Sequence, residues 1–187
     1  MKEGSRRKIR SALHLAERTG AFSEPELTVL GEVLRDCLLK HEEGYRFEEI
    51  EEDGEMAGFL IWGRTPMTKR GYDIYWIAVD PALQGKGFGK LLMARVEEAA
   101  CGEAGGCILR LETSGREEYG RQRTFYGSCG FMEAGRIRDF YREGDDLVTY
   151  VKFVTRDLKD QLRKRSTVNG KAKPVQGYQV QSSKGKM

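Results

Sequence analysis

The sequence predicts one α/β domain with a mixed central β-sheet flanked by helices. The chain has 187 residues, of which 39% are apolar, enough for one domain with its own core. Segments of helical periodicity alternate along it with segments typical of strands. Residues 72–79 are nearly all apolar or aromatic, as expected for a strand buried on both faces. We place the domain at residues 1–154, followed by a tail at 155–187.

Two helices are expected at the start of the chain. From Ile9 onward, apolar residues recur at positions i, i+3, i+4 and i+7, which indicates an amphipathic helix. The second helix begins after Ser23, because Ser23 and Glu26 have the spacing of a capping box. Leucines at 27, 30, 34 and 38 form its apolar stripe.

The remaining elements are marked by turn residues. Asp53-Gly54 between two strand-like segments is a strong hairpin signal. Gly130 is placed to end a helix in the left-handed conformation. In chain order, we expect strands at 45–52, 55–62 and 72–79, a helix from 88 to the glycines at 102, 105 and 106, a strand at 108–113, a helix at 120–129 and a closing pair of strands at 133–141 and 147–154.

Composition excludes several classes of protein. No segment approaches the roughly 20 apolar residues of a membrane span, and the charged first 22 residues lack the apolar region of a secretory signal. The four cysteines form no CxxC pair, and there are two histidines, so neither a disulfide framework nor a metal site is expected. These features favour a cytoplasmic protein without membrane contact.

The tail is basic. Residues 155–187 hold nine Lys or Arg and two Asp, a local charge of +7, which leaves −4 on the rest of a chain whose net charge is +3. Its few apolar residues cannot offset the entropy of ordering, so we expect most of it to be disordered. A basic tail is compatible with nucleic-acid binding or with a merely solvated terminus. No aromatic residue is interleaved in the basic cluster, so a nucleic-acid partner is not expected.

The segment Gln84–Lys90 follows a buried strand and opens a helix. Glycines, free amides and the helix dipole together favour an anion such as phosphate. The spacing excludes two common phosphate loops. Leu91 stands where a Walker loop needs Ser or Thr, and the glycines read GxGxG rather than GxGxxG.

Two motifs indicate a family. Gln84, Gly87 and Gly89 form Q-x-x-G-x-G directly after a V-D-P strand end, and about 40 residues later 125–131 reads F-Y-x-x-x-G-F. Over residues 72–131 the sequence thus resembles the GNAT superfamily of acetyltransferases, and within it the bacterial members similar to ribosomal-protein alanine N-acetyltransferases. The resemblance implies the GNAT fold and acetyl-CoA as co-substrate, with no metal.

The resemblance also implies the residues that bind acetyl-CoA. The preceding strand would pair with the pantetheine arm and the loop would surround the pyrophosphate. Many relatives carry an Asn seven residues before the catalytic tyrosine. Tyr119 stands there in this chain, and Ser114 or Thr113 could substitute for the Asn. The expected cofactor-binding set is Ile77, Ala78, Val79, Gln84, Gly85, Lys86, Gly87, Phe88, Gly89, Lys90, Ser114, Tyr119, Phe125 and Tyr126.

Three residues are candidates for catalysis. Tyr126 matches the family position that protonates the CoA sulfur, although a tyrosine packed in the core is the alternative. For the general base, Glu112 and Asp73 each place a carboxylate in an apolar strand, which costs free energy unless the group is paired or faces a cleft. The alternative for each is a salt bridge, Glu112 with Arg110 and Asp73 with a neighbouring basic residue at 69 or 70.

The expected function is transfer of an acetyl group from acetyl-CoA to a primary amine, on a small molecule or on a protein or peptide N-terminus. Tyr141, Asp145 and Asp146 in the closing hairpin could contact a cationic acceptor, unless this is only a polar hairpin tip. The alternative function is a CoA-binding regulatory module without turnover. A homodimer is expected only at the level of the family.

Overall fold

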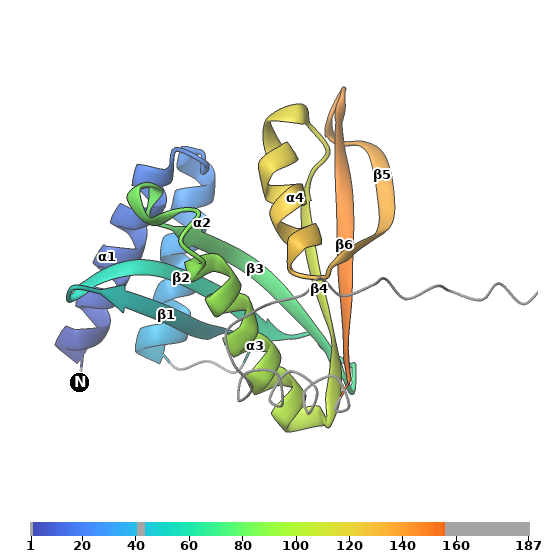
Figure 1. Ribbon diagram of the computed structural model, residues 1–187. Coiled ribbons are helices and arrows are strands. Elements are labelled where there is room, and N and C mark those ends of the chain that lie inside the picture. Colours follow the sequence, from blue (N-terminus) through green and yellow to red (C-terminus); the bar gives the residue numbers. More distant parts are fainter. Residues whose placement is uncertain (1, 41–43, 156–187) are drawn as a thin grey trace, which may run out of the picture. The chain divides into compact units, whose positions relative to one another are not determined.

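The computed structural model describes residues 2–40 and 44–155, which belong to one compact unit, Met1–Arg156. The predicted α/β fold with a mixed, helix-flanked sheet is confirmed (Figure 1). Of the basic tail expected at 155–187, residues 156–187 lie outside the described residues. The helices are α1 (Lys2–Thr19), α2 (Glu24–Arg35), α3 (Phe88–Ala104) and α4 (Gly120–Ser128), and the strands are β1 (Arg46–Glu52), β2 (Glu55–Arg64), β3 (Gly71–Val79), β4 (Gly106–Ser114), β5 (Met132–Arg142) and β6 (Asp145–Thr155).

The six strands form one sheet in the order β1-β2-β3-β4-β6-β5. Neighbouring strands are antiparallel except β3 and β4, which are parallel because α3 connects them. The parallel pair is short, since Gly71–Asp73 pairs with Ile108–Arg110 and the pairing then ends. Figure 1 shows the two strands meeting at one end and separating toward the other.

The sheet has a helix-covered core on each face. Phe59 and Ile61 of β2 pack in a cluster with residues of α1 and α2, while Leu60 and Trp62 pack in a second cluster with residues of α3. The alternation follows the two-residue period of a strand. β2 is thus the strand that is buried on both faces along most of its length. The same expectation is wrong for part of β3, because Tyr75 is 39% exposed.

The predicted element boundaries depend on local signals that the structure confirms. The Glu26 carboxylate accepts hydrogen bonds from the Ser23 amide (2.7 Å) and hydroxyl (2.6 Å) at the start of α2. Asp53 and Gly54 both have positive φ in the β1–β2 turn, and Gly130 has φ 87° after α4. The sequence did not predict that a π-helical turn, Asp36–Lys40, extends α2. No helix in the described ranges is long and apolar enough to cross a membrane.

Candidate active site

The site begins at the fork where β3 and β4 separate. Beyond Asp73, Ile77, Ala78 and Val79 still pair with β2 on one side but have no partner in β4 on the other. Tyr75 falls at a register shift between β2 and β3, and a bulge there increases local twist. The open edge therefore offers backbone N–H and C=O groups to an extended ligand, such as a chain of amides.

An ion pair closes the narrow end of the fork. Asp73 and Arg110 are the last registered pair of the two strands, and their side chains meet with Oδ1 2.6 Å from Nε. The other Asp73 oxygen accepts a hydrogen bond of 2.8 Å from the Thr65 hydroxyl. Asp73 is buried, and these bonds satisfy both of its oxygens. Its partner is thus Arg110, rather than a basic residue at 69 or 70.

Replacing Asp73 with Asn is expected to lower the free energy of unfolding by about 2 kcal/mol, because Arg110 loses a charged partner inside the fork. Chemical denaturation of the variant and the wild type measures this difference. Glu118→Gln is the matched control, since Glu118 is an exposed partner of Arg116 and its loss should cost less than about 0.5 kcal/mol. Equal losses of unfolding free energy in the two variants would mean that the ion pair between Asp73 and Arg110 does not stabilise the end of the β3–β4 pairing.

The glycine loop between β3 and α3 presents unpaired amides. Gly85 (φ 79°) and Gly87 (φ 95°) are in the left-handed region, which glycine adopts without strain. Within the described parts of the chain, the amides of Gly85, Gly87, Phe88, Gly89 and Lys90 donate to no protein acceptor. Five such amides at the start of a 17-residue helix form a favourable site for an anion.

Other loop residues fix its shape. The Gln84 side-chain amide donates to the Val79 carbonyl (3.2 Å) and so ties the loop to the end of β3. A Cβ on Gly89 would lie 3.0 Å from the Phe125 ring, so glycine is what allows α3 and α4 to approach here. Lys86 and Lys90 are exposed, and their charge is therefore available to a ligand.

Tyr126 lies on α4 with its side chain in the core. It is 9% exposed, and its ring contacts those of Phe125, Phe131 and Tyr150. Its hydroxyl makes no hydrogen bond to any described residue, yet it is not among the fully buried unpaired atoms, so some solvent reaches it. Burial raises the pKa of Tyr126 to about 12, which keeps the hydroxyl protonated at neutral pH.

Glu112 is the more accessible of the two candidate bases. It lies on β4 beyond the paired part of the fork, and its side chain is 41% exposed. One oxygen lies 3.6 Å from Nη1 of Arg110, the arginine that holds Asp73. The salt bridge weighed for Glu112 is therefore present, but it is long and leaves most of the carboxylate free.

The predicted acceptor residues fall into two separate groups. Tyr141 is half-exposed on β5, and burial together with the negative charges of Glu112, Asp145 and Glu26 raises its pKa. Asp146 lies in a second group, with residues of β5. Its two oxygens accept hydrogen bonds from the Asp139 amide and from Arg136. These hydrogen bonds lower the pKa of Asp146. Adjacent strand residues point to opposite faces of a sheet, which explains the separation of Asp145 from Asp146.

Two residues expected to bind the cofactor, Tyr119 and Ser114, lie close to the predicted acceptor residue Asp145. Tyr119 is near Glu26, Glu118 and Asp145, and burial with these charges raises its pKa. The Ser114 hydroxyl donates to Asp145 and accepts from the Arg116 amide (3.1 Å), so it is already occupied within the protein. Glu26, at the start of α2, is a member of this acidic group that sequence reasoning missed.

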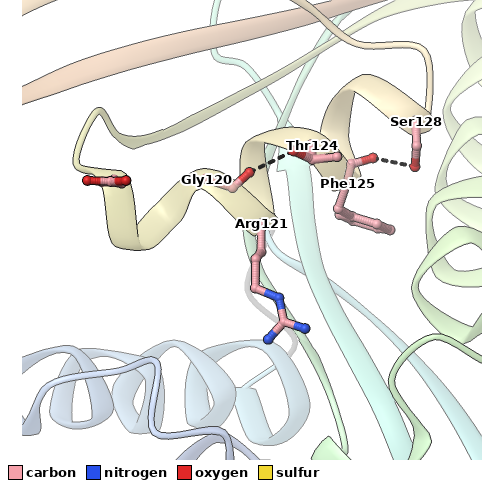
Figure 2. A pocket seen from close by; sticks show the side chains of 6 residues that line it. Gly120, Arg121, Thr124, Phe125 and Ser128 are labelled. Atoms are coloured by element: carbon pink, nitrogen blue, oxygen red, sulfur yellow. Dashed lines mark hydrogen bonds between the residues drawn. The ribbon is translucent and has the colours of Figure 1, made fainter.

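Sequence reasoning also missed a pocket on α4. The pocket has a volume of about 560 Å³ and is lined by Glu117, Gly120, Arg121, Thr124, Phe125 and Ser128. Figure 2 shows Arg121 and Phe125 projecting from the same side of the helix. The available signal was the helical spacing of Arg121, Phe125 and Ser128, at i, i+4 and i+7. In residues 2–40 and 44–155 no three His, Cys, Asp or Glu side chains are grouped as metal ligands.

Comparison with known proteins identifies the family. Residues 43–133 match the family model described as an acetyltransferase (GNAT) domain. The crystal structure of a GNAT-family protein from Desulfovibrio desulfuricans superposes with a TM-score of 0.75 at 35% identity, over 80% of this chain and 94% of that one. The chain therefore belongs to the GNAT family of acetyltransferases, which are acyltransferase enzymes.

Two further proteins are similar to this chain. The N-alpha-acetyltransferase RimI of Mycobacterium tuberculosis is 35% identical over 94 residues, which are 50% of this chain and 54% of the relative. The chain thus spans about half the length of that curated relative. The ribosomal-protein-S18-alanine N-acetyltransferase of Escherichia coli has a TM-score of 0.63 at 23% identity, over 79% of this chain and 88% of that one, which shows a common fold.

Proposed function

We propose that this protein transfers the acetyl group of acetyl-CoA to a primary amine. The observation that carries the proposal is the open edge of β3 that leads directly into a loop with five unpaired amides. CoA has the matching chemistry in the same order, because its pantetheine arm contains two amides and ends at a pyrophosphate. A neighbour of the same fold, a streptothricin acetyltransferase homologue from Bacillus anthracis (21% identical, TM-score 0.52), was solved in complex with acetyl coenzyme A, which agrees with this co-substrate.

In this proposal the pantetheine amides pair with the backbone of Ile77–Val79, and the amides of Gly85–Lys90 hold the pyrophosphate. Acetyl-CoA supplies the activated carbonyl as a thioester. The protein aligns the acceptor amine with that carbonyl, and this alignment provides much of the rate. Lys86 and Lys90 add positive charge beside the two phosphates.

Two side chains move protons in the proposed reaction. The amine nitrogen forms a bond to the acetyl carbon while the carbon–sulfur bond breaks, and the products are an amide and the CoA thiol. Glu112 accepts the proton that the amine loses, because its carboxylate is accessible whereas both oxygens of Asp73 are engaged. Tyr126 donates a proton to the departing sulfur. Its raised pKa keeps that proton in place, and the same burial disfavours a free thiolate.

The proposed acceptor is the α-amine of a polypeptide. The acidic and aromatic side chains of Glu26, Tyr119 and Tyr141, with the buried carboxylate of Asp145 beside them, suit a cationic acceptor. The match to an N-alpha-acetyltransferase favours an α-amine over other amines. An α-amine also loses its proton more easily than lysine, with a pKa near 8 against about 10.4.

A panel of acceptors tests this proposal. Peptides with a free α-amine, the same peptides with a blocked N-terminus and one lysine, and an aminoglycoside are each incubated with labelled acetyl-CoA. We expect label on the free α-amine only. Label on the aminoglycoside alone would overturn the α-amine assignment but retain the acetyltransferase. Bound acetyl-CoA with no transfer to any amine would favour a CoA-binding regulatory module.

A further inference from the structure

Arg110 on β4 contacts two carboxylates in different ways. Its Nε lies 2.6 Å from Oδ1 of Asp73, the distance of a charged hydrogen bond, and its Nη1 lies 3.6 Å from Oε1 of Glu112. The second contact is too long for a hydrogen bond and short enough for an ion pair. One guanidinium thus joins the buried carboxylate at the end of the β3–β4 pairing to the accessible carboxylate of the proposed base.

The Asp73 side chain is a fixed anchor for this guanidinium. Asp73 is 7% exposed, and the oxygen that does not face Arg110 accepts a hydrogen bond of 2.8 Å from the Thr65 hydroxyl. The backbones of Asp73 and Arg110 are also held in register by the parallel pairing of β3 and β4. Because the guanidinium is planar and rigid, fixing its Nε on Asp73 also limits where its Nη1 can lie.

Glu112 has more freedom than Asp73. Its side chain is 41% exposed, and it lies on the same face of β4 as Arg110, two residues away. Three staggered wells at each of χ1 and χ2 would give a free glutamate about nine conformations. A general base must lie within hydrogen-bond distance of the proton that it accepts, so only some of these conformations are productive. The contact with Arg110 restricts them, and its length leaves the Glu112 oxygens available as acceptors.

We propose that Arg110 is a positioning residue for acetyl transfer, which, anchored by Asp73, holds the Glu112 carboxylate where it accepts the proton of the acceptor amine. This inference rests on the proposed function, because it takes Glu112 as the general base. As the amine nitrogen bonds to the acetyl carbon, its proton passes to Glu112, and Arg110 neither gains nor loses a proton. Asp73 therefore contributes to the reaction through Arg110 and not as a base.

A double-mutant cycle on the full chain tests this assignment, with labelled acetyl-CoA and a peptide that has a free α-amine, or the aminoglycoside if only that is labelled. Arg110→Lys is made in the wild type and in Glu112→Gln. Lysine keeps a positive charge beside Asp73 but lacks the rigid fork that reaches both carboxylates. In the wild type, kcat should fall about tenfold, because Glu112 then samples about nine conformations. CoA affinity, measured by calorimetry, should not change, which also shows that the variant is folded.

In Glu112→Gln, adding Arg110→Lys should lower kcat by no more than about twofold further, since no base is left to position. Arg136→Lys is the matched control, because Arg136 also lies between two carboxylates, those of Glu133 and Asp146, each at 3.1 Å. These carboxylates have no part in the proposed reaction, so its rate should stay within about twofold of the wild type.

Two results would overturn the assignment of Arg110. One is an unchanged kcat in Arg110→Lys. The other is a tenfold fall in the Glu112→Gln background as well, which would mean that Arg110 acts on the structure and not through Glu112. Full activity of Glu112→Gln would remove both the base and its positioning residue while retaining acetyl transfer. If the wild type labels no amine, the proposed function itself fails.

Discussion

Tyr126→Phe is expected to bind CoA as the wild type does and to transfer acetyl groups about 10²-fold to 10⁴-fold more slowly, the usual contribution of a positioned general acid. The substitution removes one hydroxyl that no described residue hydrogen-bonds, so the ring packing against Phe131 and Tyr150 should persist. Steady-state rates with labelled acetyl-CoA and a calorimetric CoA affinity measure the two properties separately.

Tyr150→Phe is the matched control for this variant. Tyr150 is buried to the same extent as Tyr126 and lies beside it in the same core, but the proposed mechanism gives its hydroxyl no role. Its rate should stay within about twofold of the wild type, because a nearby hydroxyl without a proton to transfer contributes no acid catalysis. Equal losses in the two variants would mean that Tyr126 acts through packing and not as the acid.

Glu112→Gln has the second-largest expected effect, a loss of about 10²-fold in the rate with an α-amine acceptor, because the amide cannot accept the proton of the attacking amine. CoA affinity should not change, since the negative charge of Glu112 lies near Tyr141 of the proposed acceptor group and Glu112 has no part in the proposed CoA contacts. Rates are compared with those of Asp73→Asn at a temperature where both variants are folded. A larger loss in Asp73→Asn than in Glu112→Gln would assign the base to Asp73 instead.

The sequence predicts the elements and the phosphate loop because both are local properties. Capping at Ser23, the Asp53-Gly54 turn and the spacing of Gln84, Gly87 and Gly89 depend on residues a few positions apart. Such patterns can be read from the sequence alone, and the structure has helices and strands where the patterns predict them. The sequence also marks Glu112 as a candidate general base, because its carboxylate stands in an otherwise apolar strand.

Long-range pairing explains what the sequence could not predict. Asp73 meets Arg110 because three residue pairs of parallel sheet fix their register, and no local pattern records that register. Glu26 is close to Tyr141 only after α2 and β5 take their places around the sheet. Arg121 resembles any exposed arginine until the structure shows that it lines a pocket with Phe125.

The most direct test of the central claim incubates the wild type and Tyr126→Phe with acetyl-CoA labelled in the acetyl group and a bacterial lysate separated into macromolecules and metabolites. Direct detection of the label avoids thiol reagents, with which the four cysteines would react. The account predicts that the wild type labels an amine in the macromolecular fraction and that Tyr126→Phe labels it far more slowly. Tightly bound acetyl-CoA with no label in either fraction would contradict the claim that this chain is an acetyltransferase.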